Sequence, residues 1–182
     1  NGESRACAFG LLTVLSGALA ADAQTIKFGG QEYIQRVWRT EEGLPQNTVT
    51  SIVQTRDGYL WVGTFGGLAR FDGLRFTIFS SSNTPELKSN RITRLDEDRR
   101  GALWIITEQG TLTRYADGRF ADYTGQAGMP AGDIKCVALD RQENLWVGTY
   151  KQGLFQFQSG RLLKHYTTGN GLPHSNVTAI RE

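Results

Sequence analysis

The sequence predicts an all-β fold, a partial β-propeller of about three four-stranded blades with an orphan N-terminal outer strand and the start of a fourth blade. Two observations lead to this prediction. A motif repeats about every 43 residues, and each repeat contains four short β-rich runs separated by turn signals. Four strands in a repeat of this length is the period of a propeller blade. No window shows the sustained 3.6-residue periodicity of a helix.

The repeat centres on a Leu-Trp pair, at residues 60–61, 103–104 and 145–146, so that the steps are 43 and 42 residues. The run Leu60 to Val62 is continuously apolar, as expected of a strand covered on both faces. Asp57-Gly58 before it is a hairpin signal. We therefore predict blades at about 49–79, 92–123 and 134–166, with a further blade beginning at 177. The aromatic residues expected to fill the gaps between blades, as structural core, are Trp61, Trp104 and Trp146.

The first residues have the pattern of a secretory signal peptide. Arg5 precedes an apolar run over residues 6–20, and Ala21-Asp22-Ala23 provides a cleavage site. The run is shorter than the roughly 20 residues that a membrane anchor needs. We predict that residues 1–23 are removed and that the remainder is periplasmic or extracellular. Cys136 is then the only cysteine, and we expect it to be a small buried core residue.

The next residues are expected to be a linker at 24–32, followed by the orphan strand from Tyr33 to Arg39. Trp38 lies seven residues before Pro45, the same spacing that separates Tyr123 and Tyr166 from later prolines. This aligns the segment with the fourth, outermost strand of a blade. Because propeller rings have about 4 to 8 blades, we expect the sequence to be an N-terminal fragment of a longer chain, with the remaining blades supplied by that chain.

The blade motif at 55–64, 98–107 and 140–149, with the entry segment 38–47, resembles the two-component regulator propeller family. The departures are Ile106, where the other blades have Gly, and Glu143, where the other turns have Gly. The resemblance covers about residues 33–182. It implies the ligand-sensing region, outside the cytoplasm, of a hybrid or classical sensor histidine kinase. It also implies a small-molecule or glycan ligand, a homodimer of the full-length receptor, and a downstream kinase, cyclase or DNA-binding regulator in the same protein.

The residues themselves give no sign of catalysis. His165 and His174 lack metal-ligand spacing, and the sequence contains no nucleophile elbow or phosphate-binding loop. The acidic clusters at 41–42 and 96–98 are interpreted as solvated loop and turn positions. We predict no metal, no cofactor and no enzymatic activity for this region, and the net charge of +2 argues against a nucleic-acid partner. A secreted propeller enzyme, such as a lyase or a quinone-dependent dehydrogenase, and a protein-binding scaffold remain as alternatives.

Ligand binding is expected in the loops that enter the innermost strands or connect the second strand of a blade to the third. Some residues there differ between blades at equivalent places, although a purely structural turn should repeat. These loops can also be read as ordinary variable loops. The candidate ligand-binding residues are Phe65, Glu108, Gln109, Tyr150 and Lys151.

Overall fold

The computed structural model describes residues 24–126 and 128–181, so the predicted signal peptide lies outside the described residues. The chain divides into two compact units at the boundary between Val37 and Trp38. The described residues contain no helix that is long and apolar enough to cross a membrane. The only helical element among them is a 3-10 turn at Thr40–Glu42.

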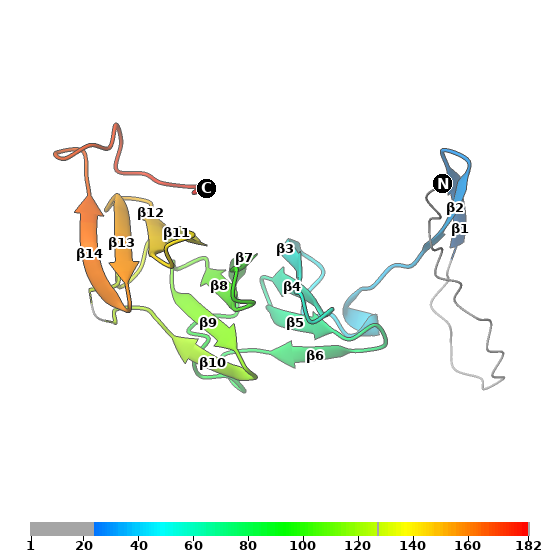
Figure 1. Ribbon diagram of the computed structural model, residues 1–182. Helices are drawn as coiled ribbons and strands as arrows, with labels where there is room; N and C mark the ends of the chain where they lie inside the picture. The colour runs from blue at the N-terminus through cyan, green and yellow to red at the C-terminus, as the bar shows by residue number, and fades with distance from the viewer. Residues whose placement is uncertain (1–23, 127, 182) are drawn as a thin grey trace. The chain divides into compact units, whose positions relative to one another are not determined.

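Three four-stranded antiparallel sheets make up the second unit, and they confirm the predicted fold class (Figure 1). In every sheet, each strand pairs with the next along the chain. The first blade contains β3 (Val49–Gln54), β4 (Leu60–Thr64), β5 (Gly67–Phe71) and β6 (Phe76–Phe79). The second contains β7 (Ile92–Glu97), β8 (Leu103–Thr107), β9 (Leu112–Ala116) and β10 (Arg119–Asp122). The third contains β11 (Ile134–Leu139), β12 (Leu145–Thr149), β13 (Leu154–Gln158) and β14 (Arg161–Tyr166).

The repeated Asp and Trp of the motif are linked by a hydrogen bond in the second and third blades. The indole N–H of Trp104 donates to Oδ2 of Asp98 at 2.8 Å, and that of Trp146 donates to Asp140 at the same distance. The other carboxylate oxygen of Asp98 accepts two backbone N–H groups of the turn. In the first blade, Thr55 takes the place of Asp and accepts the indole N–H at 3.2 Å. The motif therefore fixes the turn and the tryptophan orientation together, because buried polar groups need partners.

Neighbouring blades pack through aromatic and aliphatic side chains. Trp61 is 1% exposed, and its ring centroid lies 4.9 Å from that of Tyr115 in the next blade. Trp104 is also buried. Trp146 is only half-buried and stacks on Tyr166 of its own blade, 5.8 Å away. Trp61 and Trp104 therefore form part of the packing between blades, whereas Trp146 is less completely buried than the predicted structural-core role implies.

A glycine after the tryptophan allows close approach of the following chain segment. A Cβ on Gly63 would lie 2.8 Å from Cγ2 of Ile92, and one on Gly148 would lie 2.7 Å from Cγ1 of Val177. The second blade has Ile106 at this position, which is buried in a core cluster with Ile134. The junction between the second and third blades thus has room for a side chain that the other two positions exclude.

The N-terminal prediction is wrong in its details. Residues 24–35 are not a linker followed by an orphan outer strand, because β1 (Gln24–Phe28) and β2 (Gln31–Gln35) pair with each other as a hairpin. The turn is Gly29-Gly30, both with positive φ, a combination that suits two-residue hairpin loops. Local pairing prevails because the turn holds the two runs next to each other.

Trp38 nevertheless takes the aromatic position that the alignment assigned to it. Its ring lies 5.3 Å from Phe71 and 6.5 Å from Phe76 of the first blade. In the same way, Phe79 of the first blade lies 5.0 Å from Phe120 of the second. The aromatic side chain is therefore placed as predicted, although the strand that was expected to carry it does not form.

The start of a fourth blade is also not observed as a strand. Residues 177–181 have no strand assignment, because no described segment offers them a second strand with which to pair. The backbone of Val177 still donates to the carbonyl of Thr149 at 2.8 Å, and Gly153 donates to Ser175 at 2.9 Å. This segment lies along the third blade at the place where the repeat puts the next innermost strand.

Candidate functional site

The candidate ligand-binding residues lie in equivalent loops on one edge of the three blades. Phe65 follows β4, Glu108 and Gln109 follow β8, and Tyr150 and Lys151 follow β12. The strands show that these loops share an edge with the starts of the innermost strands. Val49 pairs with Thr64, Ile92 with Thr107 and Ile134 with Thr149. We call this edge the loop face.

An arginine that the sequence analysis missed connects two of the candidates. The guanidinium of Arg91 lies 4.2 Å from the ring centroid of Phe65, within the range of a cation–π contact. The same group binds both carboxylate oxygens of Glu108, with Nη2 at 3.2 Å from Oε1 and Nε bonded to Oε2. This ion pair holds the pKa of Glu108 below its ordinary value. Phe65 and Glu108, from adjacent blades, are thus joined through one side chain.

The third blade contributes a second aromatic and cationic group. Tyr150 is 48% exposed, with the ammonium groups of Lys135 and Lys151 at 5.9 Å and 5.7 Å from its ring centroid. The charge of Lys135 also contributes to lowering the pKa of Glu108. Gln109 is exposed, and its side chain makes no hydrogen bond within the described part of the chain.

The bases of these loops are held by threonines. The hydroxyl of Thr64 donates to the carbonyl of Gly67 at 2.8 Å, and that of Thr149 donates to Gly153 at 2.9 Å. Both threonines are fully buried. The loop face therefore has fixed loop bases and bears the half-buried ring of Phe65, the exposed ring of Tyr150, three cations and one carboxylate. Such a surface can stack on a flat polar ligand and bind anionic or hydroxyl groups.

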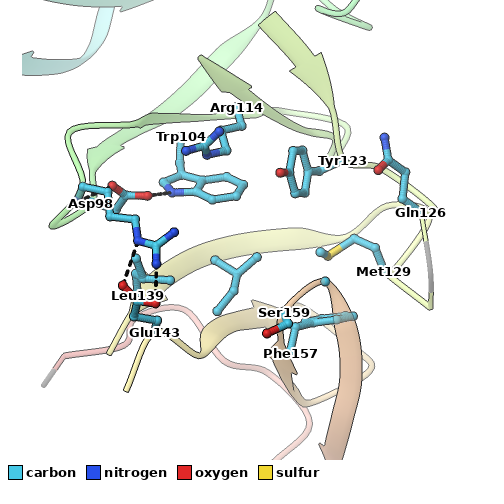
Figure 2. Close-up of a pocket in the computed structure, with 13 residues that line it drawn as sticks. Asp98, Trp104, Arg114, Tyr123, Gln126, Met129, Leu139, Glu143, Phe157 and Ser159 are labelled. Carbon is cyan, nitrogen blue, oxygen red and sulfur yellow. Dashed lines mark hydrogen bonds and ion pairs between the residues drawn. The ribbon is translucent and has the colours of Figure 1, made fainter. Parts of the chain in front are cut away.

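A cavity of about 400 Å³ lies between the second and third blades (Figure 2). Figure 2 shows Trp104, Arg114 and Tyr123 from the second blade on one side, and Phe157 and Ser159 from the third on the other. The sequence analysis did not predict this cavity. The cavity could have been indicated by comparing side chains at equivalent positions of adjacent blades, such as Tyr115 and Phe157. That comparison requires the strand register.

The remaining reactive groups have structural environments. Within residues 24–126 and 128–181, no three His, Cys, Asp or Glu side chains group as metal ligands would. Asp98, from the acidic cluster at 96–98, is buried and hydrogen-bonded to Trp104, so it is not a solvated turn residue as predicted. Cys136 is fully buried, and desolvation raises the pKa of its thiol to about 11. A thiol in such an environment is a poor nucleophile.

Comparison with known proteins identifies the repeat. The model of the two component regulator propeller family matches residues 43–66 and 128–151. Histidine kinase P4 of Formosa agariphila is 38% identical over 64 residues, which is 35% of this chain and 4% of that protein. The chain therefore spans a small part of this curated relative.

Solved structures show the same fold. One is the extracellular domain of BT3049, a protein of B. thetaiotaomicron that is named as a hybrid two component system. It superposes on this chain with a TM-score of 0.67 at 20% sequence identity. That match covers 81% of this chain and 20% of the other. The extracellular domain of BT4673 from the same organism superposes with a TM-score of 0.60 at 23% identity, covering 74% and 21%. The chain is thus a β-propeller region. Two of its segments, residues 43–66 and 128–151, are similar to the repeat of the two component regulator propeller family.

Proposed function

We propose that this chain is the ligand-sensing propeller, outside the cytoplasm, of a two-component signalling receptor. In this proposal it passes a signal to a histidine kinase or cyclase elsewhere in the same protein. The observation that carries the proposal is the contrast between constant loop bases and variable loop tips. The buried threonines Thr64, Thr107 and Thr149 recur in every blade, whereas the residues that follow them differ: Phe65 is half-buried, and Glu108 and Tyr150 are exposed.

Loop residues that differ from blade to blade do not stabilise the repeat in the way that its constant positions do. They are instead suited to recognition, for which loops on a rigid scaffold are commonly used. The family match includes the loop tips of the first and third blades, and the similar solved structures are extracellular domains. These findings support a receptor role, and the ring-bearing, cationic loop face supports a glycan or another flat polar molecule as ligand.

The test uses the full-length receptor in cells, with its output read from a reporter while a panel of neutral and acidic oligosaccharides is supplied. Tyr150→Ala should raise the inducer concentration for half-maximal response by about tenfold or more, because a stacking ring commonly dominates a small interface. Phe65→Ala should also raise it. Leu74→Ala is the control, since Leu74 is 86% exposed in the turn between β5 and β6. Wild-type responses from both loop-face variants would contradict the proposal, as would consumption of the inducer by the purified protein.

A further inference from the structure

The two junctions between blades are built on the same strand pairing but differ in how one arginine is used. Arg70 pairs across from Trp61 in the first blade, and Arg114 pairs across from Trp104 in the second. Because partners in an antiparallel pair project from the same face, each arginine faces the junction with the following blade. The two side chains can therefore be compared directly.

Arg70 is fully engaged by its surroundings. Its guanidinium lies 4.4 Å from the ring centroid of Tyr59 and 5.6 Å from that of Trp61. Its Nη1 donates to the hydroxyl of Tyr115 at 3.2 Å, across the junction. Phe120 packs beside Tyr115, with ring centroids 4.7 Å apart. These groups surround the Arg70 guanidinium in the first junction.

Arg114 lacks the equivalent partners. Ala102 stands where the first blade has Tyr59, and Phe157, which has no hydroxyl, stands where the second blade has Tyr115. The Arg114 guanidinium lies 5.8 Å from the ring centroid of Trp104. Within the described part of the chain it makes no hydrogen bond or ion pair, although it is half-buried.

The carboxylates that line the same cavity are already occupied. Asp98 accepts the indole N–H of Trp104 and two backbone N–H groups. Glu143 is bound by Arg100, whose Nε lies 2.9 Å from Oε1. In the described part of the chain, neither carboxylate forms an ion pair with Arg114. Among the described residues, the Arg114 guanidinium is therefore the charged group of this cavity that makes no hydrogen bond or ion pair.

The rest of the cavity provides walls for a ring. The rings of Trp104 and Tyr123 meet edge to face, 5.1 Å apart at 79°, and Phe157 and Met129 add apolar surface. Leu162 replaces Phe120 at the equivalent outer-strand position and is 42% exposed, so it does not fill the space. The volume of about 400 Å³ is in the range of small-molecule sites, which span roughly 300–1,000 Å³.

We propose that this cavity binds a ring-bearing carboxylate, with the carboxylate on Arg114 and the ring against Trp104 and Tyr123. A guanidinium matches a carboxylate with two parallel hydrogen bonds, and aromatic walls accept either an aromatic ring or the apolar face of a sugar. The inference rests on the cavity between blades and not on the loop face. A negative result for this cavity would therefore leave the proposed function untouched, and a negative result for the loop face would leave this inference untouched.

The test is calorimetric titration of the full-length protein with benzoate and glucuronate, each compared with its neutral counterpart, benzyl alcohol or glucose. At least one of the two carboxylates should bind. The dissociation constant of its neutral counterpart should be higher by about tenfold or more, because the neutral molecule cannot form the charge-assisted hydrogen bonds. Binding of benzoate alone would indicate aromatic acids as the source, and binding of glucuronate alone would indicate acidic sugars. Failure of both carboxylates, or equal binding of the neutral counterparts, would overturn the proposal.

Two substitutions locate the binding. Arg114→Gln should weaken it by about tenfold or more, whereas Arg70→Gln, at the equivalent position of the first blade, should leave it unchanged. Phe157→Tyr places a hydroxyl near Arg114, as Tyr115 does for Arg70, and should weaken binding while the protein stays folded. Wild-type affinity in folded Arg114→Gln would overturn the assignment. If Arg114→Gln failed to fold, wild-type affinity in Phe157→Tyr would overturn it.

Discussion

The junction between the first and second blades and the junction between the second and third share a strand pattern but not their contents. In the first, Arg70 is held between Tyr59 and the hydroxyl of Tyr115. In the second, Ala102 replaces the tyrosine ring and Phe157 replaces the tyrosine that carries the hydroxyl. A cavity of about 400 Å³ lies beside Arg114. The difference teaches that the side chains at a few equivalent positions decide whether the junction arginine is enclosed by protein groups or lies beside a cavity.

The largest expected effect concerns Trp61, the tryptophan of the first junction. Trp61→Ala should lower the free energy of unfolding by about 3–5 kcal/mol, the usual cost of removing a buried aromatic ring. Trp146→Ala should cost about half as much, because Trp146 is only half-buried and less apolar area is lost. Urea denaturation monitored by fluorescence provides both values. Equal losses would show that the blades do not depend on packing at the junction.

A somewhat smaller effect is expected at Gly63, where the backbone approaches the next blade closely. The added Cβ of Gly63→Ala would lie 2.8 Å from Cγ2 of Ile92, and relieving that overlap should cost about 1–3 kcal/mol. Gly169→Ala is the control, because its nearest neighbour would be 3.7 Å away and its φ is not positive. Thermal unfolding should separate the two variants. A Gly63→Ala protein as stable as the control would mean that the first and second blades can move apart at Ile92 without a loss of stability.

The smallest expected effect is a pH dependence at the second junction. Arg100 hydrogen-bonds the carboxylate of Glu143 and keeps its pKa below the ordinary 4.5. A lowered carboxyl pKa stabilises the fold fully above the unfolded value, and this stabilisation is lost as pH falls through the folded value. The difference in melting temperature between wild type and Glu143→Gln should therefore be present at pH 7 and disappear on acidification below pH 4.5. A difference that did not change with pH would show that the pair contributes nothing.

The three blades could be predicted from sequence because the interactions that define them are local and repeated. The bond from Trp104 to Asp98 spans six residues, and its counterpart in the third blade spans the same number. A motif of this kind can be recognised in a single chain. The five candidate residues were correctly placed in equivalent loops by the same alignment, although their role in binding remains a prediction.

The features that sequence did not predict depend on contacts formed after folding or on competing local signals. Arg91 belongs to the loop face because it reaches Glu108 from a neighbouring chain segment. The cavity depends on what Phe157 lacks relative to Tyr115, a comparison that needs the register of two blades. The N-terminal hairpin was not predicted, although Gly29-Gly30 is a turn signal that the sequence contains.

The contrast between the two junctions is tested most directly by the free energies of unfolding of Arg70→Gln and Arg114→Gln, measured side by side by urea denaturation. Arg70→Gln should lose about 1–3 kcal/mol, since it removes a hydrogen bond and a stacked cation from a filled space. Arg114→Gln should change stability by less than about 0.5 kcal/mol, as a side chain without protein hydrogen-bond partners should. Equal losses at the two positions would contradict the account, because Arg114 would then stabilise the blades as Arg70 does.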